Sequence, residues 1–225
     1  MMKNVAFSIL ILGLFAGALF AISGASTSGI GQTRWDQSVT AGSAPTVGGN
    51  ITSVNVASTR LTTKWADFYG NVTGTIRLSD TQAGDAVYVW TYSPATGGEV
   101  CVSTNTSLAF ASLTNATHAA IDANFSTTGD PDDSDSTFTD AAGCPSMTIA
   151  SQAVTGFLSA TNQGSGSDFQ TCAMSSGGLA AANHAFCTAI DNSGQNYLGD
   201  AANYEIIVPT GDPTGVTYYF YVELD

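Results

Sequence analysis

Residues 216–224 read Val-Thr-Tyr-Tyr-Phe-Tyr-Val-Glu-Leu, and this run of β-branched and aromatic residues is the clearest strand signal in the chain. Similar alternating or branched runs lie at residues 72–79, 87–92 and 204–208. Weaker signals lie at residues 51–58, 100–104, 147–150, 168–173 and 185–190. Gly, Asp, Asn or Pro separates most of these runs, which is typical of many short strands joined by turns.

The composition favours the same fold class. Among 225 residues there are 24 glycines, and turn-forming Asp far outnumbers the helix-favouring Glu and Lys. We therefore predict an all-β protein, an antiparallel β-sandwich of the jelly-roll or immunoglobulin-like kind. The alanine-rich residues 113–125 predict one short helix, inside an insertion at residues 105–145. Trp90, on an alternating run, is expected in the core.

The charge balance excludes several classes of function. Eighteen acidic residues against five basic ones give a net charge of −13, and no Lys or Arg follows Arg77. Nucleic-acid binding needs clustered basic side chains, so it is excluded as a main task. No P-loop, catalytic triad or facing pair of carboxylates is recognisable, because Glu99, Glu205 and Glu223 are scattered and the last two are expected on an outer face. We predict a non-enzyme without catalytic residues.

The first residues indicate export. Lys3 precedes an apolar run at residues 5–22, and small residues follow it, which is the pattern of a secretory signal peptide. We expect this peptide to span residues 1–25, with cleavage after Ala25 or after Ser23. An uncleaved membrane anchor and a helix retained in a filament core are the alternatives. Cleavage predicts an extracellular or cell-surface protein with no membrane span.

Cysteine usage agrees with an oxidising compartment. The four cysteines are Cys101, Cys144, Cys172 and Cys187. Four cysteines allow three pairings, and proximity along the chain favours Cys101–Cys144 with Cys172–Cys187. Free buried thiols are the alternative, whereas zinc is disfavoured because no Cys-x-x-Cys occurs.

Glycosylation is a second expectation that depends on export. Asn-x-Ser/Thr acceptor sites occur at Asn50, Asn71, Asn105, Asn115 and Asn124. All of them precede residue 127, so the glycans would gather on the first half of the exported chain.

The chain divides into two parts after the signal peptide. Residues 26–49 are rich in Ser, Thr, Gly and Ala, which predicts a flexible N-terminal arm. Residues 50–225 are expected to form the β-sandwich domain. Its closing aromatic strand must be paired internally or used as an interface, because an open apolar edge invites association.

An acidic loop is the sharpest local motif. Asp130, Asp132, Asp133 and Asp135 lie within six residues, and their oxygen atoms suit Ca²⁺. The spacing is not that of an EF-hand, which needs a Gly and a Glu that are absent here. A solvated acidic turn is the alternative interpretation.

Three segments resemble parts of uncharacterised secreted and cell-surface β-sandwich proteins of archaea. They are residues 62–76, Thr-Thr-Lys-Trp-Ala-Asp-Phe-Tyr-Gly-Asn-Val-Thr-Gly-Thr-Ile, and the strand-like residues 204–209 and 217–224. The resemblance implies a structural protein of the cell surface and supplies no active-site residue.

These observations together predict a structural subunit of an extracellular filament or cell-surface assembly. Self-association would occur by donation of a strand from the N-terminal arm to a neighbouring copy. The alternative is a secreted adhesin module that binds Ca²⁺ at the acidic loop and glycans on aromatic side chains. The aromatic residues at 65–69 could provide such a platform, although aromatic clusters more often pack in a core.

Overall fold

The structure is a computed structural model that describes residues 22–34, 41–81, 84–93, 95–139, 143–145, 147–150, 152–154, 158–161, 169–177, 180, 183–211 and 215–225. The predicted signal peptide lies outside these ranges up to residue 21. Among the described helices, none is both long and apolar enough to cross a membrane.

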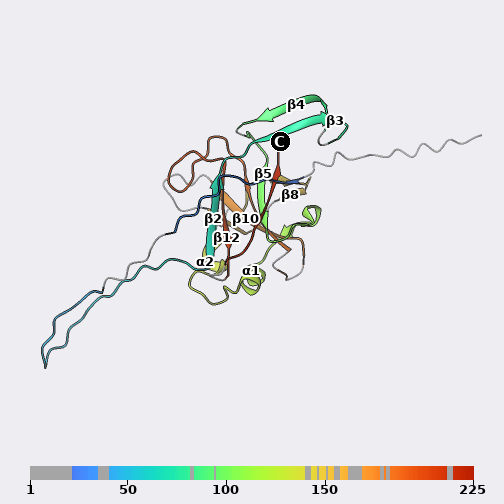
Figure 1. The fold of residues 1–225 in the computed structure, drawn as a ribbon. Coiled ribbons are helices and arrows are strands. Elements are labelled where there is room, and N and C mark those ends of the chain that lie inside the picture. The colour runs from blue at the N-terminus through green and yellow to red at the C-terminus, as the bar shows by residue number, and fades with distance from the viewer. Residues whose placement is uncertain are drawn as a thin grey trace, which may run out of the picture.

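The centre of the molecule is a seven-stranded antiparallel sheet, which confirms the all-β prediction (Figure 1). Its strands, in spatial order, are β1 (Ser23–Gly24), β13 (Tyr219–Glu223), β5 (Glu99–Ser103), β11 (His184–Ala189) and β10 (Gln170–Ser175). The far edge of β10 pairs with both β6 (Thr114–Asn115) and β9 (Leu158–Thr161). The predicted runs at residues 100–104, 168–173, 185–190 and 216–224 are therefore strands of one sheet.

Smaller strand pairs cover both faces of this sheet, which gives sandwich-like layering. β2 (Trp65–Gly70) pairs with β12 (Tyr204–Pro209), and Ile206 packs with Val100 and Phe186 in one core cluster. The β7 (Met147–Ile149) and β8 (Gln152–Val154) hairpin lies on the other face, where Ile149 packs with Cys101. Neighbouring residues of β5 thus pack into core clusters on opposite faces of the sheet, because successive side chains of a strand point to opposite sides. The finer jelly-roll or immunoglobulin-like assignment stays a prediction.

The insertion at residues 105–145 contains the described helices: the 3₁₀ turn η1 (Phe110–Ser112), α1 (His118–Phe125) and α2 (Ser134–Thr137). The hydroxyl of Thr117 accepts a hydrogen bond from the Ala120 amide and caps the start of α1, and Ser126 ends it in the left-handed conformation. The predicted helix is confirmed, but it begins later, because Thr114 and Asn115 form β6 instead.

A separate hairpin stands away from the sheet (Figure 1). It consists of β3 (Gly74–Ser79) and β4 (Ala86–Tyr92), which pair with each other. Ile76 faces Trp90 and Leu78 faces Tyr88 across the pair, and all four side chains are exposed. The expectation that Trp90 is a core residue is therefore wrong. The alternating pattern correctly indicated a strand, but no further layer covers this one in the described structure.

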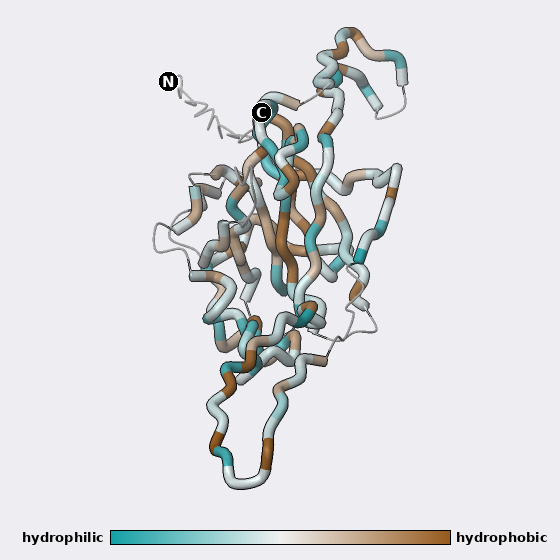
Figure 2. The backbone as a smooth tube through the Cα atoms, turned by 90° about the vertical axis from the view of Figure 1, so that its left-hand side faces the viewer, coloured by the Kyte–Doolittle hydropathy of each residue, from teal (hydrophilic) through white to brown (hydrophobic). Residues whose placement is uncertain are grey.

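The strand predicted at residues 51–58 is also wrong. Residues 41–60, named here the projecting loop, extend away from the body and are exposed throughout (Figures 1 and 2). A strand needs a partner for its backbone hydrogen bonds, and within the described ranges no other strand pairs with these residues. Apolar side chains on this loop, including Ile51 and Val56, consequently remain uncovered.

The two disulfides join Cys101 to Cys187 and Cys144 to Cys172, so the pairing favoured by chain proximity is wrong. Cys101, Cys187 and Cys172 lie in one row across β5, β11 and β10. The Cα atoms of Cys101 and Cys187 are 4.1 Å apart, which is the short spacing of a non-hydrogen-bonded antiparallel pair. Sheet register thus joins cysteines separated by 86 residues in sequence.

Candidate functional site

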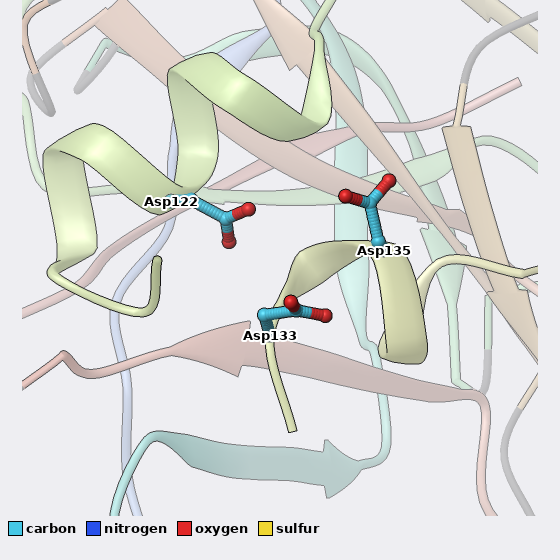
Figure 3. Close-up of side chains that lie close together, drawn as sticks. All are labelled: Asp122, Asp133 and Asp135. Carbon is cyan, nitrogen blue, oxygen red and sulfur yellow. The ribbon is translucent and has the colours of Figure 1, made fainter. Parts of the chain in front are cut away.

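The acidic residues gather where α1 and α2 meet. Asp122 projects from α1, Asp133 caps the start of α2, and Asp135 lies within α2 (Figure 3). One carboxylate oxygen from each lies within 4.8 Å of those of the other two. The arrangement brings three negative charges to one place, of which Asp122 is buried and Asp135 is exposed.

Hydrogen bonds already use part of this oxygen set. Asp122 Oδ1 accepts from the Thr127 hydroxyl at 2.6 Å and from the Ser134 amide at 2.9 Å. Burial acts to raise the pKa of Asp122, but these hydrogen bonds outweigh it and hold the pKa below its ordinary value. Asp133 Oδ1 accepts from the Ser136 amide at 2.9 Å as the cap of α2.

This arrangement suits a hard cation that takes some of its ligands from water. Ca²⁺ prefers six to eight oxygen ligands, and the three carboxylates could supply part of that number. Asp122 was missed by sequence reasoning, because it lies eleven positions before Asp133 on a helix rather than in the acidic loop. A buried acid on a helix beside an acidic loop is the signal that would have found it.

The other two predicted ligands have a different role. Asp130 forms an ion pair with Lys64 at 3.0 Å, and Asp132 accepts a hydrogen bond from the Thr62 hydroxyl at 2.5 Å. Arg60 approaches Asp132 at 4.0 Å. These contacts hold the base of the projecting loop against the segment before α2. The structure therefore brings together two of the four predicted metal ligands, and the other two anchor the loop.

The aromatic cluster at 65–69 is divided between core and surface. Trp65 packs edge-on against Phe138 with ring centroids 5.6 Å apart, and Phe68 packs against the core cluster. Tyr69 is exposed and contacts Tyr197. Two other aromatic side chains, Tyr88 and Trp90 on the β3–β4 hairpin, are exposed and lie side by side with ring centroids 4.6 Å apart.

Two buried acids cross-link the layers. Glu99 and Glu223 face each other across β5 and β13, and both are buried, which corrects the expectation that Glu223 lies on an outer face. Glu99 accepts a hydrogen bond from the Thr148 amide, and Glu223 accepts one from the Ala150 amide. Burial, opposed by the Thr148 hydrogen bond and reinforced by nearby Asp225 and Glu223, raises the pKa of Glu99 to about 7.

Glu205 is buried as well, again contrary to the expected outer position. Its carboxylate accepts a hydrogen bond from the Tyr197 amide. Asp67 lies diagonally across the β2–β12 pair. Although the Asp67 residue as a whole is exposed, desolvation of its carboxyl group and the charge of Glu205 raise the pKa of Asp67. These acids are bound to backbone or to each other, which suits a role in the fold.

The glycosylation sites differ in accessibility. Asn50, Asn71 and Asn115 are exposed, whereas Asn105 and Asn124 are half-buried. The Asn124 side-chain nitrogen, to which a glycan would be attached, is buried. Asn50, Asn71 and Asn115 are therefore the better placed acceptors. Asn50 lies at the turn of the projecting loop, where its amide donates to the Val47 carbonyl.

Comparison with protein-family models, with curated proteins and with solved structures finds no match to this chain.

Proposed function

We propose that this chain is an extracellular structural subunit that assembles with copies of itself into a filament or layer at the cell surface. The observation that carries the proposal is the projecting loop, in which every residue is exposed and Val47, Ile51, Val54 and Val56 lie uncovered. Exposed apolar side chains gathered on an extension commonly mark an interaction site.

The chemistry of the loop supports a partner that is a copy of the same chain. A net charge of −13 makes copies repel one another, yet residues 41–59 carry no charged side chain. A neutral, extended segment can add to a sheet edge through backbone hydrogen bonds. A contact between an arm and a different surface of the next copy does not close on itself, so it propagates. The two disulfides fit the oxidising surroundings of an exported protein.

The test compares the intact secreted chain with a variant lacking residues 41–59, which keeps the contacts of Arg60, Thr62 and Lys64. Negative-stain electron microscopy and sedimentation velocity at several concentrations measure assembly. We expect regular polymers from the intact chain and monomers with an unchanged circular dichroism spectrum and melting temperature from the variant. Monodisperse particles from the intact chain, or polymers from the variant, would contradict the proposal.

An adhesin module is the second candidate, favoured by the cluster of Asp122, Asp133 and Asp135 and by exposed Tyr88 and Trp90. A ligand that binds only the folded state raises the melting temperature as its concentration rises. We expect a Ca²⁺-dependent increase that EDTA reverses and that Asp133→Asn weakens, if this function holds. An unchanged melting temperature across millimolar Ca²⁺ would dispose of the metal site.

A further inference from the structure

β1 is a short cover on an otherwise open sheet edge. β13 pairs with β5 along its whole length on one side, from Tyr219 to Glu223. On the other side, the described structure gives it only Ser23, Gly24 and the amide of Ala25, which donates to the Phe220 carbonyl at 2.9 Å. This pairing shows that the outer edge of β13 accepts an antiparallel strand.

The side chains of this cover leave space beside it. A groove of about 190 Å³ lies along β1 and β13, and its lining residues are Gly24, Ala25, Thr106, Tyr219, Phe220 and Tyr221. The groove is open to solvent, and it has room for side chains larger than those of Gly24 and Ala25. Gly24 and Ala25 have too little side chain to fill it. Ile22, which precedes β1, packs on the core cluster of Cys101 and Tyr221, so the unfilled space lies beside Gly24 and Ala25.

The cover also coincides with the predicted processing site. Cleavage after Ala25 removes Ser23 and Gly24 from the sheet, and cleavage after Ser23 divides β1. Either event opens the edge of β13 and exposes Phe220 and Tyr221 further. An open edge beside aromatic side chains readily recruits another strand.

We infer that, in the processed protein, residues 51–56 of a second copy take the place of β1 on β13; residues 51–56 are named here the donor segment. This inference rests on the proposed function and specifies the contact that joins the subunits. Val54 and Val56 are two residues apart, so both would face the groove if the segment were a strand. Their side chains are β-branched and exposed, which suits a strand that lacks only its partner.

The position of the loop favours a second copy over the same chain. The projecting loop leaves the body near α2 and the start of β2 and extends away from it (Figures 1 and 2). Its base is held there by the contacts of Thr62 and Lys64 with Asp132 and Asp130. The donor segment and the lining of the groove carry no charge, so the contact avoids the repulsion between acidic subunits.

A photo-crosslinking experiment on the full secreted chain tests this inference. Tyr219 is replaced by p-benzoylphenylalanine, and chains labelled with light and heavy nitrogen are mixed before assembly and irradiation. The crosslinked product is digested with trypsin, which cleaves after Arg34 and Arg60 and releases the donor segment within residues 35–60. Mass spectrometry then identifies the crosslinked peptide. We expect light–heavy crosslinks between position 219 and this peptide. A probe at Thr106, on the same groove, replaces the first if the Tyr219 variant does not fold.

Proline variants supply the matched control. Val54→Pro removes a backbone donor from the donor segment, and Thr46→Pro places the same residue elsewhere in the projecting loop. We expect Val54→Pro to lose at least nine-tenths of the crosslink and of the polymer, while Thr46→Pro keeps both. Circular dichroism should show the same folded body in both variants, since neither position contacts it.

The outcomes separate this inference from the proposed function. Polymers whose crosslinks reach another segment, or only the same chain, would overturn the donor contact while leaving self-assembly in place. The unprocessed precursor, kept in detergent with β1 intact, should give a several-fold weaker crosslink, and an equal one would show that β1 does not guard the edge. If the intact chain forms no polymer and no crosslink, the proposed function and the inference fail together.

Discussion

β12 and the donor segment are both short segments that carry branched apolar side chains, yet one is buried and the other is exposed. Ile206 of β12 is completely buried in the core cluster that also contains Val100 and Phe186 of the main sheet, whereas Ile51 is as exposed as in an extended peptide. Each residue of β12 has a partner on β2, but no strand among the described residues pairs with the donor segment. A strand-like pattern thus marks a segment that needs a partner, and for the donor segment the partner that we propose is a second copy of the chain.

Matched isoleucine substitutions test this difference most strongly. Ile206→Ala leaves a cavity in the core, and we expect the free energy of unfolding to fall by about 3 kcal/mol. Ile51→Ala removes the same atoms from an exposed site, so its unfolding free energy should stay within about 0.5 kcal/mol of the unsubstituted chain. Urea unfolding measures both values. Equal destabilisation by the two substitutions would contradict this difference between a buried and an exposed strand-like segment.

A pH series tests the buried body of the molecule without touching the projecting loop. The pKa of Glu99 is raised from 4.5 to about 7 in the folded protein, so the folded state binds this proton more tightly than the unfolded state. The stabilisation is complete below pH 4.5 and is lost as the pH rises through 7. A tenfold change in proton affinity corresponds to about 1.4 kcal/mol, and we expect unfolding to become easier by about 2 kcal/mol between pH 5 and pH 8.

Glu99→Gln is the informative variant for this effect. The amide oxygen can still accept the hydrogen bond from the Thr148 amide, but it carries no charge at any pH. We expect the stability of Glu99→Gln to vary less between pH 5 and pH 8 than that of the unsubstituted chain. The remaining variation comes from Asp67, whose pKa burial and the charge of Glu205 also raise. Asp200→Asn, at an exposed acid, is the control and should leave the pH dependence as it was. If the unfolding free energy of Glu99→Gln changed with pH as much as that of the unsubstituted chain, the pH dependence would come from other groups.

The smallest effect is expected where the projecting loop joins the body. Lys64 forms the ion pair with Asp130 and donates a hydrogen bond to the Ser126 carbonyl at 2.7 Å. Because partly exposed ion pairs contribute little, Lys64→Met should lower the unfolding free energy by about 0.5–1 kcal/mol. Limited trypsin digestion should nevertheless cleave faster after Arg60, since the base of the loop is released. Cleavage at an unchanged rate would show that Thr62 and Arg60 suffice as an anchor.

The strands of the body were largely predictable because local pattern and tertiary burial agree there. The runs at residues 204–208 and 216–224 have the branched and aromatic side chains that a covered strand requires, and both are strands. Trp90 is a position where the local pattern predicts the strand but not the burial. Its run forms β4, but no layer among the described residues covers the hairpin. Alternation is a property of a segment, whereas burial depends on what other segments place over it.

The candidate metal centre was only half predictable for a similar reason. Asp133 and Asp135 follow from the dense acidic loop, but Asp122 joins them only because α1 packs beside α2. Asp130 and Asp132 were separated from the cluster by basic residues about 70 positions earlier in the chain. A local sequence motif cannot indicate which of its acidic residues will form an ion pair with a distant lysine or arginine.

The sequence by itself determined the class of the protein: short strands separated by turns, few charges, a net negative charge, four cysteines and an apolar beginning. These properties depend on composition and on neighbours along the chain. Only the tertiary structure decided which cysteines join, which acids are buried and which strand-like segment stays without a partner. Such outcomes depend on sheet register and on the packing of layers, which bring together residues that are far apart in sequence.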